Sequence, residues 1–153
     1  MTRWLTEDEQ RNWRAWLAAS VLLHDRLTRE LQAQHGLTMA DYEILVRLSE
    51  ADERRMRMSD LAEKTLSSRS RLSHQIDRME KAGLVGRQLC SDDRRGAFAV
   101  LTDHGWDTLV AAAPDHVASV RTHLVDVLTP QEFSELGSAC RQVAEHLGES
   151  DGL

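Results

Sequence analysis

The chain has little of what marks several common classes of protein. Its 153 residues include only two cysteines, Cys90 and Cys140, too few for the disulfide framework of a small secreted domain. No stretch approaches the roughly 18 apolar residues of a membrane span, and the N-terminus has no apolar segment of a secretory signal. We therefore expect a cytoplasmic protein without a membrane partner.

Catalytic motifs are also missing. The sequence contains no nucleophile elbow, phosphate-binding loop or dinucleotide fingerprint, so we do not expect an enzyme. Its seven histidines show no HExxH spacing, and no CxxC pair accompanies them, so no metal or other cofactor is predicted. A sensor gated by a metal, or by oxidation of Cys90 at the end of a predicted strand, is kept as an alternative.

The overall charge is negative, but its distribution is uneven. The net charge of −6 argues at first against a nucleic-acid partner. Between Arg54 and Arg95, however, eleven Lys and Arg face six Asp and Glu, a balance of +5, while the remainder holds eight basic and nineteen acidic residues, or −11. A basic middle between acidic ends is typical of a DNA-facing module carried on acidic helices.

The basic middle begins with a pattern of two helices and a tight turn. Ser59 can cap a helix that runs to Leu66, and Ser67 and Ser68 then interrupt it. From Arg69 to Lys81, apolar residues at spacings of four and three form one stripe. Gly83 follows where a left-handed residue ends a helix. This order predicts a helix-turn-helix.

The second of these helices has a polar face suited to DNA. Arginine, histidine, glutamine and arginine recur there at positions i, i+3, i+4 and i+7. Arginine can pair with guanine and glutamine with adenine in the major groove, while serines near the helix start can bind phosphate. The predicted DNA contacts are Ser68, Arg69, Ser70, Arg71, Ser73, His74, Gln75 and Arg78.

A hairpin with a basic tip follows. The runs 84–90 and 97–101 have strand propensity, and the six residues between them include Arg94 and Arg95. Residues 56–58 could add a third strand. A hairpin directly after a recognition helix is the winged-helix arrangement, and we expect the two arginines to meet a minor groove or phosphate. A winged helix used for protein contact is the alternative.

The flanking segments predict long helices with apolar stripes. Thr6 and Thr38 can cap the first two, Thr102 a long one after the hairpin, and Thr129 a final one. Pro114 should kink or break the long helix. Apolar stripes this far from the central module predict contact with a second copy of the chain.

Three segments resemble the MarR family of winged-helix regulators. They are Ile76–Val85 (IDRMEKAGLV), Asp93–Arg95 (DRR) and Leu101–Gly105 (LTDHG). The resemblance implies a mainly α fold: a winged helix-turn-helix at 36–102 with a small β-hairpin wing, between dimerisation helices at 1–35 and 103–153. It also implies a homodimer that binds pseudo-palindromic double-stranded DNA as a transcriptional repressor relieved by a small ligand.

The resemblance further implies a ligand cleft between the dimerisation helices and the winged module. The candidate lining residues are Trp13, Trp16, Tyr42 and Trp106, although aromatics at helical spacing are more often core residues. The chain has Arg71 where the family commonly has a small hydroxyl residue, and His74 where arginine is common. The operator sequence therefore cannot be transferred from relatives.

Overall fold

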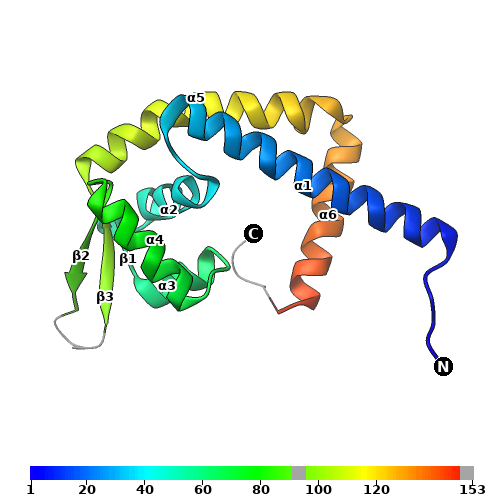
Figure 1. Ribbon diagram of the computed structural model, residues 1–153, viewed down its shortest axis with the longest axis horizontal. Helices are drawn as coiled ribbons and strands as arrows, with labels where there is room; N and C mark the ends of the chain where they lie inside the picture. Colours follow the sequence, from blue (N-terminus) through cyan, green and yellow to red (C-terminus); the bar gives the residue numbers. More distant parts are fainter. Residues whose placement is uncertain (91–95, 149–153) are drawn as a thin grey trace.

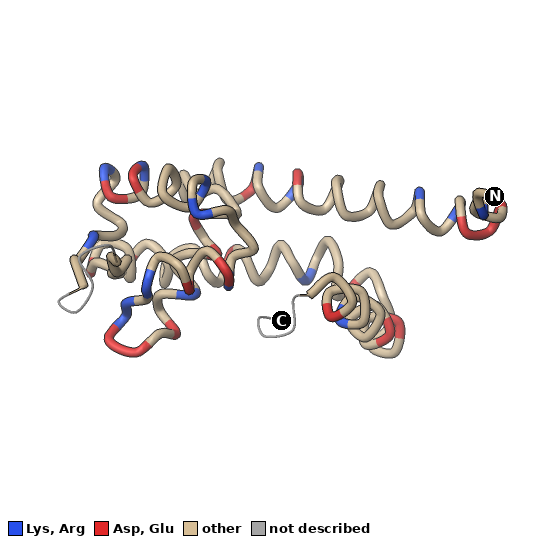
Figure 2. The backbone as a smooth tube through the Cα atoms, turned by 90° about the horizontal axis from the view of Figure 1, so that it is seen from below, with Lys and Arg blue, Asp and Glu red and all other residues tan. Residues whose placement is uncertain are grey.

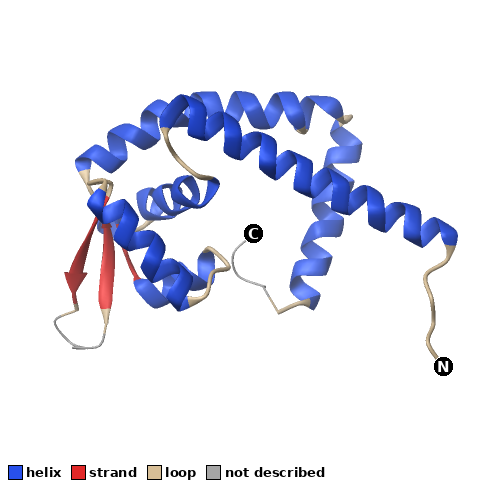
Figure 3. Cartoon of the chain, in the orientation of Figure 1, coloured by secondary structure: helices blue, strands red, loops and turns tan. Residues whose placement is uncertain are grey.

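The computed structural model describes residues 1–90 and 96–148, which form helices around one small sheet (Figures 1 and 3). The mainly α winged-helix fold predicted from the sequence is confirmed. In chain order the described elements are α1 (Glu7–His35), α2 (Met39–Glu50), η1 (Asp52–Arg54), β1 (Arg55–Arg57), α3 (Met58–Lys64), α4 (Arg69–Lys81), β2 (Val85–Leu89), β3 (Ala97–Leu101), α5 (Asp103–His123), η2 (Val125–Val127) and α6 (Pro130–His146).

Side-chain hydroxyls begin most of the long helices, as predicted. Thr6, Thr38, Ser68, Thr102 and Thr129 each accept a hydrogen bond from the backbone N–H three residues further on. The three threonines that begin α1, α2 and α6 form full capping boxes, in which the acidic third residue bonds back to the cap. These bonds satisfy N–H groups that have no partner within the helix.

The winged module packs α2, α3 and α4 against a three-stranded sheet of order β1-β3-β2. Strand β3 is antiparallel to both neighbours, and β1 lies one residue earlier than predicted. Leu45 and Leu48 from α2, Leu61 from α3 and Ile76 from α4 are fully buried in one core. This core fixes α4 against α2 and α3.

The long helices lie beside the winged module. Helices α1 and α5 run side by side, and α6 runs crosswise from the end of α5 (Figure 1). Two histidine–carboxylate hydrogen bonds join α1 to α5: His35 to Asp115 at 2.9 Å and His123 to Glu30 at 2.8 Å. In α6, which the structure describes throughout, no residue is buried.

The prediction for the first helix of the helix-turn-helix is wrong at both ends. Helix α3 begins at Met58, directly after β1, and Arg57 occupies the cap position without a side-chain cap bond. Ser59 therefore lies inside the first turn and bonds Asp60. The helix ends at Lys64, and Leu66 follows with a left-handed φ of 52°.

Of the kink or short break predicted at Pro114, the break does not occur. Helix α5 runs without interruption from Asp103 to His123, with Pro114 inside it. A proline in a helix interior costs about 3 kcal/mol. Leu109 and Ala112 are buried before it, and the bonds of Asp115 and His123 to α1 follow it. Tertiary contacts therefore hold the helix together on both sides of the proline.

Candidate nucleic-acid interface

Helix α4 presents a polar face to solvent from a rigid position. Ser68 caps it with a 3.1 Å bond from the Arg71 N–H, and Leu72, Ile76 and Met79 are buried beneath it. Gly83 has the predicted left-handed conformation, with φ 74°. The polar residues that the structure leaves exposed are Ser68, Arg69, Ser70, Arg71, His74 and Arg78, while Ser73 is half-buried.

Gln75 does not lie on this exposed face, contrary to the expectation that it could pair with adenine. It is 8% exposed, and its amide is hydrogen-bonded to Asp41 of α2 and to Arg78. The polar pattern along the helix did not reveal this because Asp41 lies 34 residues away. Gln75 therefore belongs to the contact between α4 and α2, and Arg78 next to it stays exposed.

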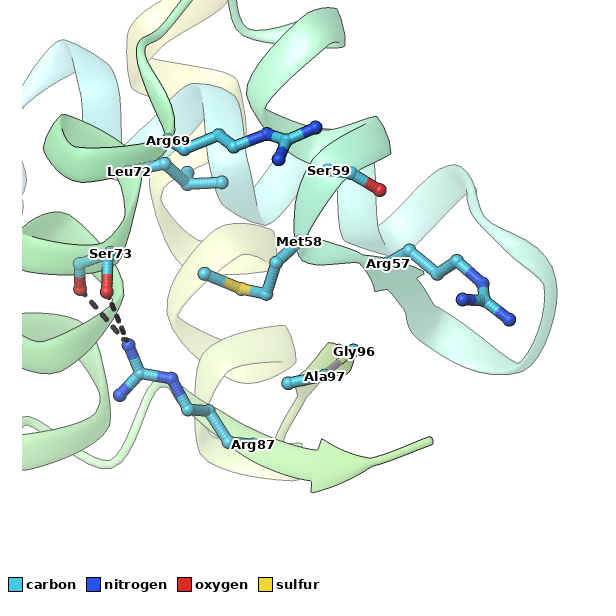
Figure 4. A pocket seen from close by; sticks show the side chains of 9 residues that line it. All are labelled: Arg57, Met58, Ser59, Arg69, Leu72, Ser73, Arg87, Gly96 and Ala97. Atoms are coloured by element: carbon cyan, nitrogen blue, oxygen red, sulfur yellow. Dashed lines mark hydrogen bonds between the residues drawn. The ribbon is translucent and has the colours of Figure 1, made fainter. Parts of the chain in front are cut away.

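A cleft beside the start of α4 gathers three arginines from different elements. Arg57 comes from the end of β1, Arg69 from the first turn of α4, and Arg87 from β2. Figure 4 shows them around the opening, with Met58 and Leu72 between them. Of these three, only Arg69 is among the DNA contacts predicted from the sequence, although all of them contribute to the basic excess of the central segment.

The three arginines are not equally available to a ligand. Arg87 forms an ion pair with Asp77 and donates to the backbone oxygen of Ser73 at 3.2 Å and to its hydroxyl at 3.3 Å. The hydrogen bond from Arg87 holds the pKa of Asp77 below its ordinary value. Among the described residues, Arg57 and Arg69 form no ion pair. Arg87 thus fastens the wing to α4. The Arg57 guanidinium carbon lies 5.5 Å from the centroid of the Phe98 ring, but neither Arg57 nor Arg69 has an acidic partner among the described residues, so both can bind an anion.

The tip of the wing lies outside the described residues, so the predicted contacts of Arg94 and Arg95 are not placed. The hairpin below it is described. Cys90 is buried at the end of β2, where its N–H donates to the carbonyl of Gly96 at 3.1 Å.

The start of α5 is joined closely to the end of α4. The Thr102 hydroxyl donates to the carbonyl of Gly83 at 2.6 Å, and its N–H donates to that of Leu84 at 3.2 Å. A side chain on Gly105 would overlap the Leu84 carbonyl, so only glycine allows this approach. The LTDHG segment thus connects the long helix rigidly to the recognition helix.

Comparison with known proteins decides the family. A model of the MarR family matches residues 37–96. The crystal structure of AbsC, a MarR family transcriptional regulator from Streptomyces coelicolor, is 57% identical in sequence, with 95% of this chain and 98% of that chain covered and a TM-score of 0.91. This chain belongs to the MarR family of transcriptional regulators.

Further relatives agree with this assignment. Sco3205, a MarR family regulator from Streptomyces coelicolor solved in complex with DNA, is 45% identical, with 99% of this chain and 95% of that chain covered and a TM-score of 0.95. The regulator MhqR of Bacillus subtilis is 23% identical over 126 residues, which cover 82% of this chain and 81% of that protein. The chain that carries the exposed basic residues of α4 is thus a member of a family of transcriptional regulators.

The four aromatic residues proposed for a ligand cleft have different surroundings in this MarR family member. Trp16 lines an apolar groove with residues of α1, α5 and α6. Trp13 is 52% exposed. Tyr42 packs against His116 with ring centroids 4.3 Å apart and the rings tilted by 46°. The Arg54 guanidinium carbon lies 4.0 Å from the centroid of the Trp106 ring. Burial raises the pKa of Tyr42 and lowers that of His116.

Metal-binding groups, membrane-spanning helices and cysteines bear on the alternative functions. Among residues 1–90 and 96–148, no group of three or more histidine, cysteine or carboxylate side chains could hold a metal ion. In the same part of the chain, no helix is both long enough and apolar enough to cross a membrane. Cys90 is buried and Cys140 half-buried, and both are free thiols.

Proposed function

We propose that this regulator binds duplex DNA with α4 in the major groove and the arginine-lined cleft beside the phosphate backbone. The observation that carries the proposal is the exposure of Arg71, His74 and Arg78 along α4, together with the cleft that Arg69 of its first turn lines with Arg57. Basic positions lie along several segments of the winged module, whereas the start of α1, at the far end, is acidic (Figure 2). Basic side chains bind base edges and phosphates.

We further propose that the protein acts as a homodimer through α1, α5 and α6. Helix α6 carries Phe133 and Val143 as exposed apolar side chains, and the exposed Leu147 follows at its end. Helix α1 carries the exposed Trp13 and Trp16. Exposed apolar surface of this extent is unusual for a monomer. Two recognition helices held about 34 Å apart would meet successive major grooves on one side of the duplex.

The third part of the proposal is repression relieved by a small ligand. Membership in the family supports it, and the apolar groove beside Trp16 is the candidate binding place. Such a ligand lowers DNA affinity only if it binds the DNA-free arrangement more tightly. A compound that quenches tryptophan fluorescence and releases DNA over the same concentration range is the expected result.

Genomic footprinting with purified protein tests the function as a whole. We expect protection of a pseudo-palindrome in a promoter region. The mass of the protein, measured separately in solution, should equal that of two chains. Deleting the gene should raise transcription from that promoter. A monomeric protein, or one that protects no genomic fragment in low salt, would contradict the proposal.

A further inference from the structure

A buried amide on the recognition helix connects a second helix to an exposed arginine. The Nε2 of Gln75 donates to Oδ1 of Asp41 at 2.5 Å, and its Oε1 accepts from Nη2 of Arg78 at 2.5 Å. The other oxygen of Asp41, Oδ2, accepts from the backbone N–H of Thr38 at 2.9 Å. A continuous chain of hydrogen bonds thus runs from the first turn of α2 to the polar face of α4.

The chemistry of the end groups fixes the direction of this chain. The Asp41 carboxylate can only accept hydrogen bonds, and the Arg78 guanidinium can only donate them. Gln75 must therefore turn its NH₂ group towards Asp41 and its oxygen towards Arg78. A flipped amide would place the NH₂ group of Gln75 against the donors of Arg78 and its oxygen against the carboxylate of Asp41. Because Gln75 is only 8% exposed, little water can replace the lost hydrogen bonds.

We propose that Asp41 and Gln75 are positioning residues, which hold Arg78 in the orientation that contacts a base edge. This inference rests on the proposed function, because it takes Arg78 to be a base contact. An arginine held in place before binding loses less side-chain freedom when DNA arrives. A residue of α2 that never touches DNA thereby contributes to the sequence preference of α4.

The first experiment measures base preference at a single position. Wild-type protein selects a duplex from a random-sequence pool, and dissociation constants are then measured with each of the four bases at every position. The position at which Arg78→Ala abolishes preference is the one that Arg78 reads. Gln75→Met keeps the length of the side chain but removes both bonds. We expect the preference at that position to fall about tenfold, within the range of one bidentate base contact.

A matched control separates positioning from helix capping. Thr38→Ala removes the hydroxyl that accepts from the Asp41 N–H at 3.0 Å, so it weakens the start of α2 but leaves Oδ1 of Asp41 for Gln75. Thermal unfolding should show a loss of stability for Thr38→Ala. Its base preference at the position read by Arg78 should match that of the wild type.

An exchange of the two functional groups provides the sharpest test. Gln75→Glu alone sets a carboxylate against Asp41 and should lose the preference. With Asp41→Asn added, the new asparagine can accept from Thr38 and donate to the new glutamate, which accepts from Arg78. The net charge then returns to that of the wild type. Because positions 41 and 75 are in direct contact, their effects should be coupled, and we expect the double variant to recover the preference to within about twofold of wild type.

The outcomes distinguish this inference from the function on which it rests. Wild-type preference in Gln75→Met, no base position sensitive to Arg78→Ala, or a double variant no better than Gln75→Glu would each overturn the inference while DNA binding stands. If the wild-type protein selects no duplex, the proposed function and the inference fail together. Loss of base preference in Gln75→Met and Gln75→Glu, with recovery in the double variant, would establish the inference.

Discussion

Replacing Arg57 with alanine is expected to make DNA binding less sensitive to salt. Arg57 lies at the rim of the cleft beside α4, and among the described residues it forms no ion pair, so its charge is available to a backbone phosphate. Each phosphate neutralised by a protein cation changes the slope of log K against log salt by about −0.9. A homodimer loses two such contacts, so the slope should become shallower by about 1.8.

This change of slope is large enough to measure directly. When the salt concentration rises from about 50 to 200 mM, the fold loss in affinity should be roughly ten times smaller for Arg57→Ala than for the wild type. Fluorescence anisotropy of a labelled operator duplex over a series of KCl concentrations gives both slopes. At low salt, Arg57→Ala should lower the affinity for the operator and for unrelated duplexes by a similar factor, because phosphate contacts do not depend on sequence.

A control on α5 tests whether the effect is local. Arg121→Ala removes the same charge from a residue outside the winged module, where Arg121 pairs with Asp126 at 2.5 Å. Its slope should equal that of the wild type. An unchanged slope for Arg57→Ala, or an equal shift for both variants, would refute the assignment of a phosphate to the cleft.

Three further predictions concern single residues. Gly105→Ala should destabilise the fold by about 1–3 kcal/mol in urea unfolding, because the new methyl group meets the Leu84 carbonyl. Glu30 accepts hydrogen bonds from Ser119 and His123, which lower its pKa below its ordinary value of 4.5. Its ionised form therefore stabilises the fold above that pH, and the advantage in melting temperature of the wild type over Glu30→Gln should shrink as the pH falls below 4.5. Arg94→Ala should weaken binding to all duplexes about equally in gel-shift titrations.

Each of these predictions has a result that contradicts it. A methyl group added at Gly86 would meet no other described residue within 4 Å, so Gly86→Ala should be milder than Gly105→Ala, and equal losses would remove the close approach as the cause. A difference between wild type and Glu30→Gln that stays constant with pH would show that the carboxylate charge is not involved. Unchanged binding by Arg94→Ala would exclude the wing arginine from the interface.

The sequence alone determined the features that depend on neighbours a few residues apart. Hydroxyl caps such as Thr102 and Ser68 bond to an N–H three residues away, and the apolar stripe of α4 repeats within a turn. Gly83 ends that helix through its own backbone angle. Such interactions are encoded locally, so the order of helices, turn and hairpin could be predicted before any coordinates.

Tertiary structure decided whatever depends on residues far apart in the chain. Gln75 is of a residue type, and at a helical spacing, that suits base recognition. It is buried, however, and its side chain is hydrogen-bonded to Asp41, 34 positions earlier. Helix α5 passes Pro114 because packing against α1 offsets the missing backbone bond. Arg57 and Arg69 become neighbours only when β1 and α4 meet at one cleft. Hydrogen bonds and burial between distant segments leave no periodic pattern, and for this reason the sequence alone could not reveal them.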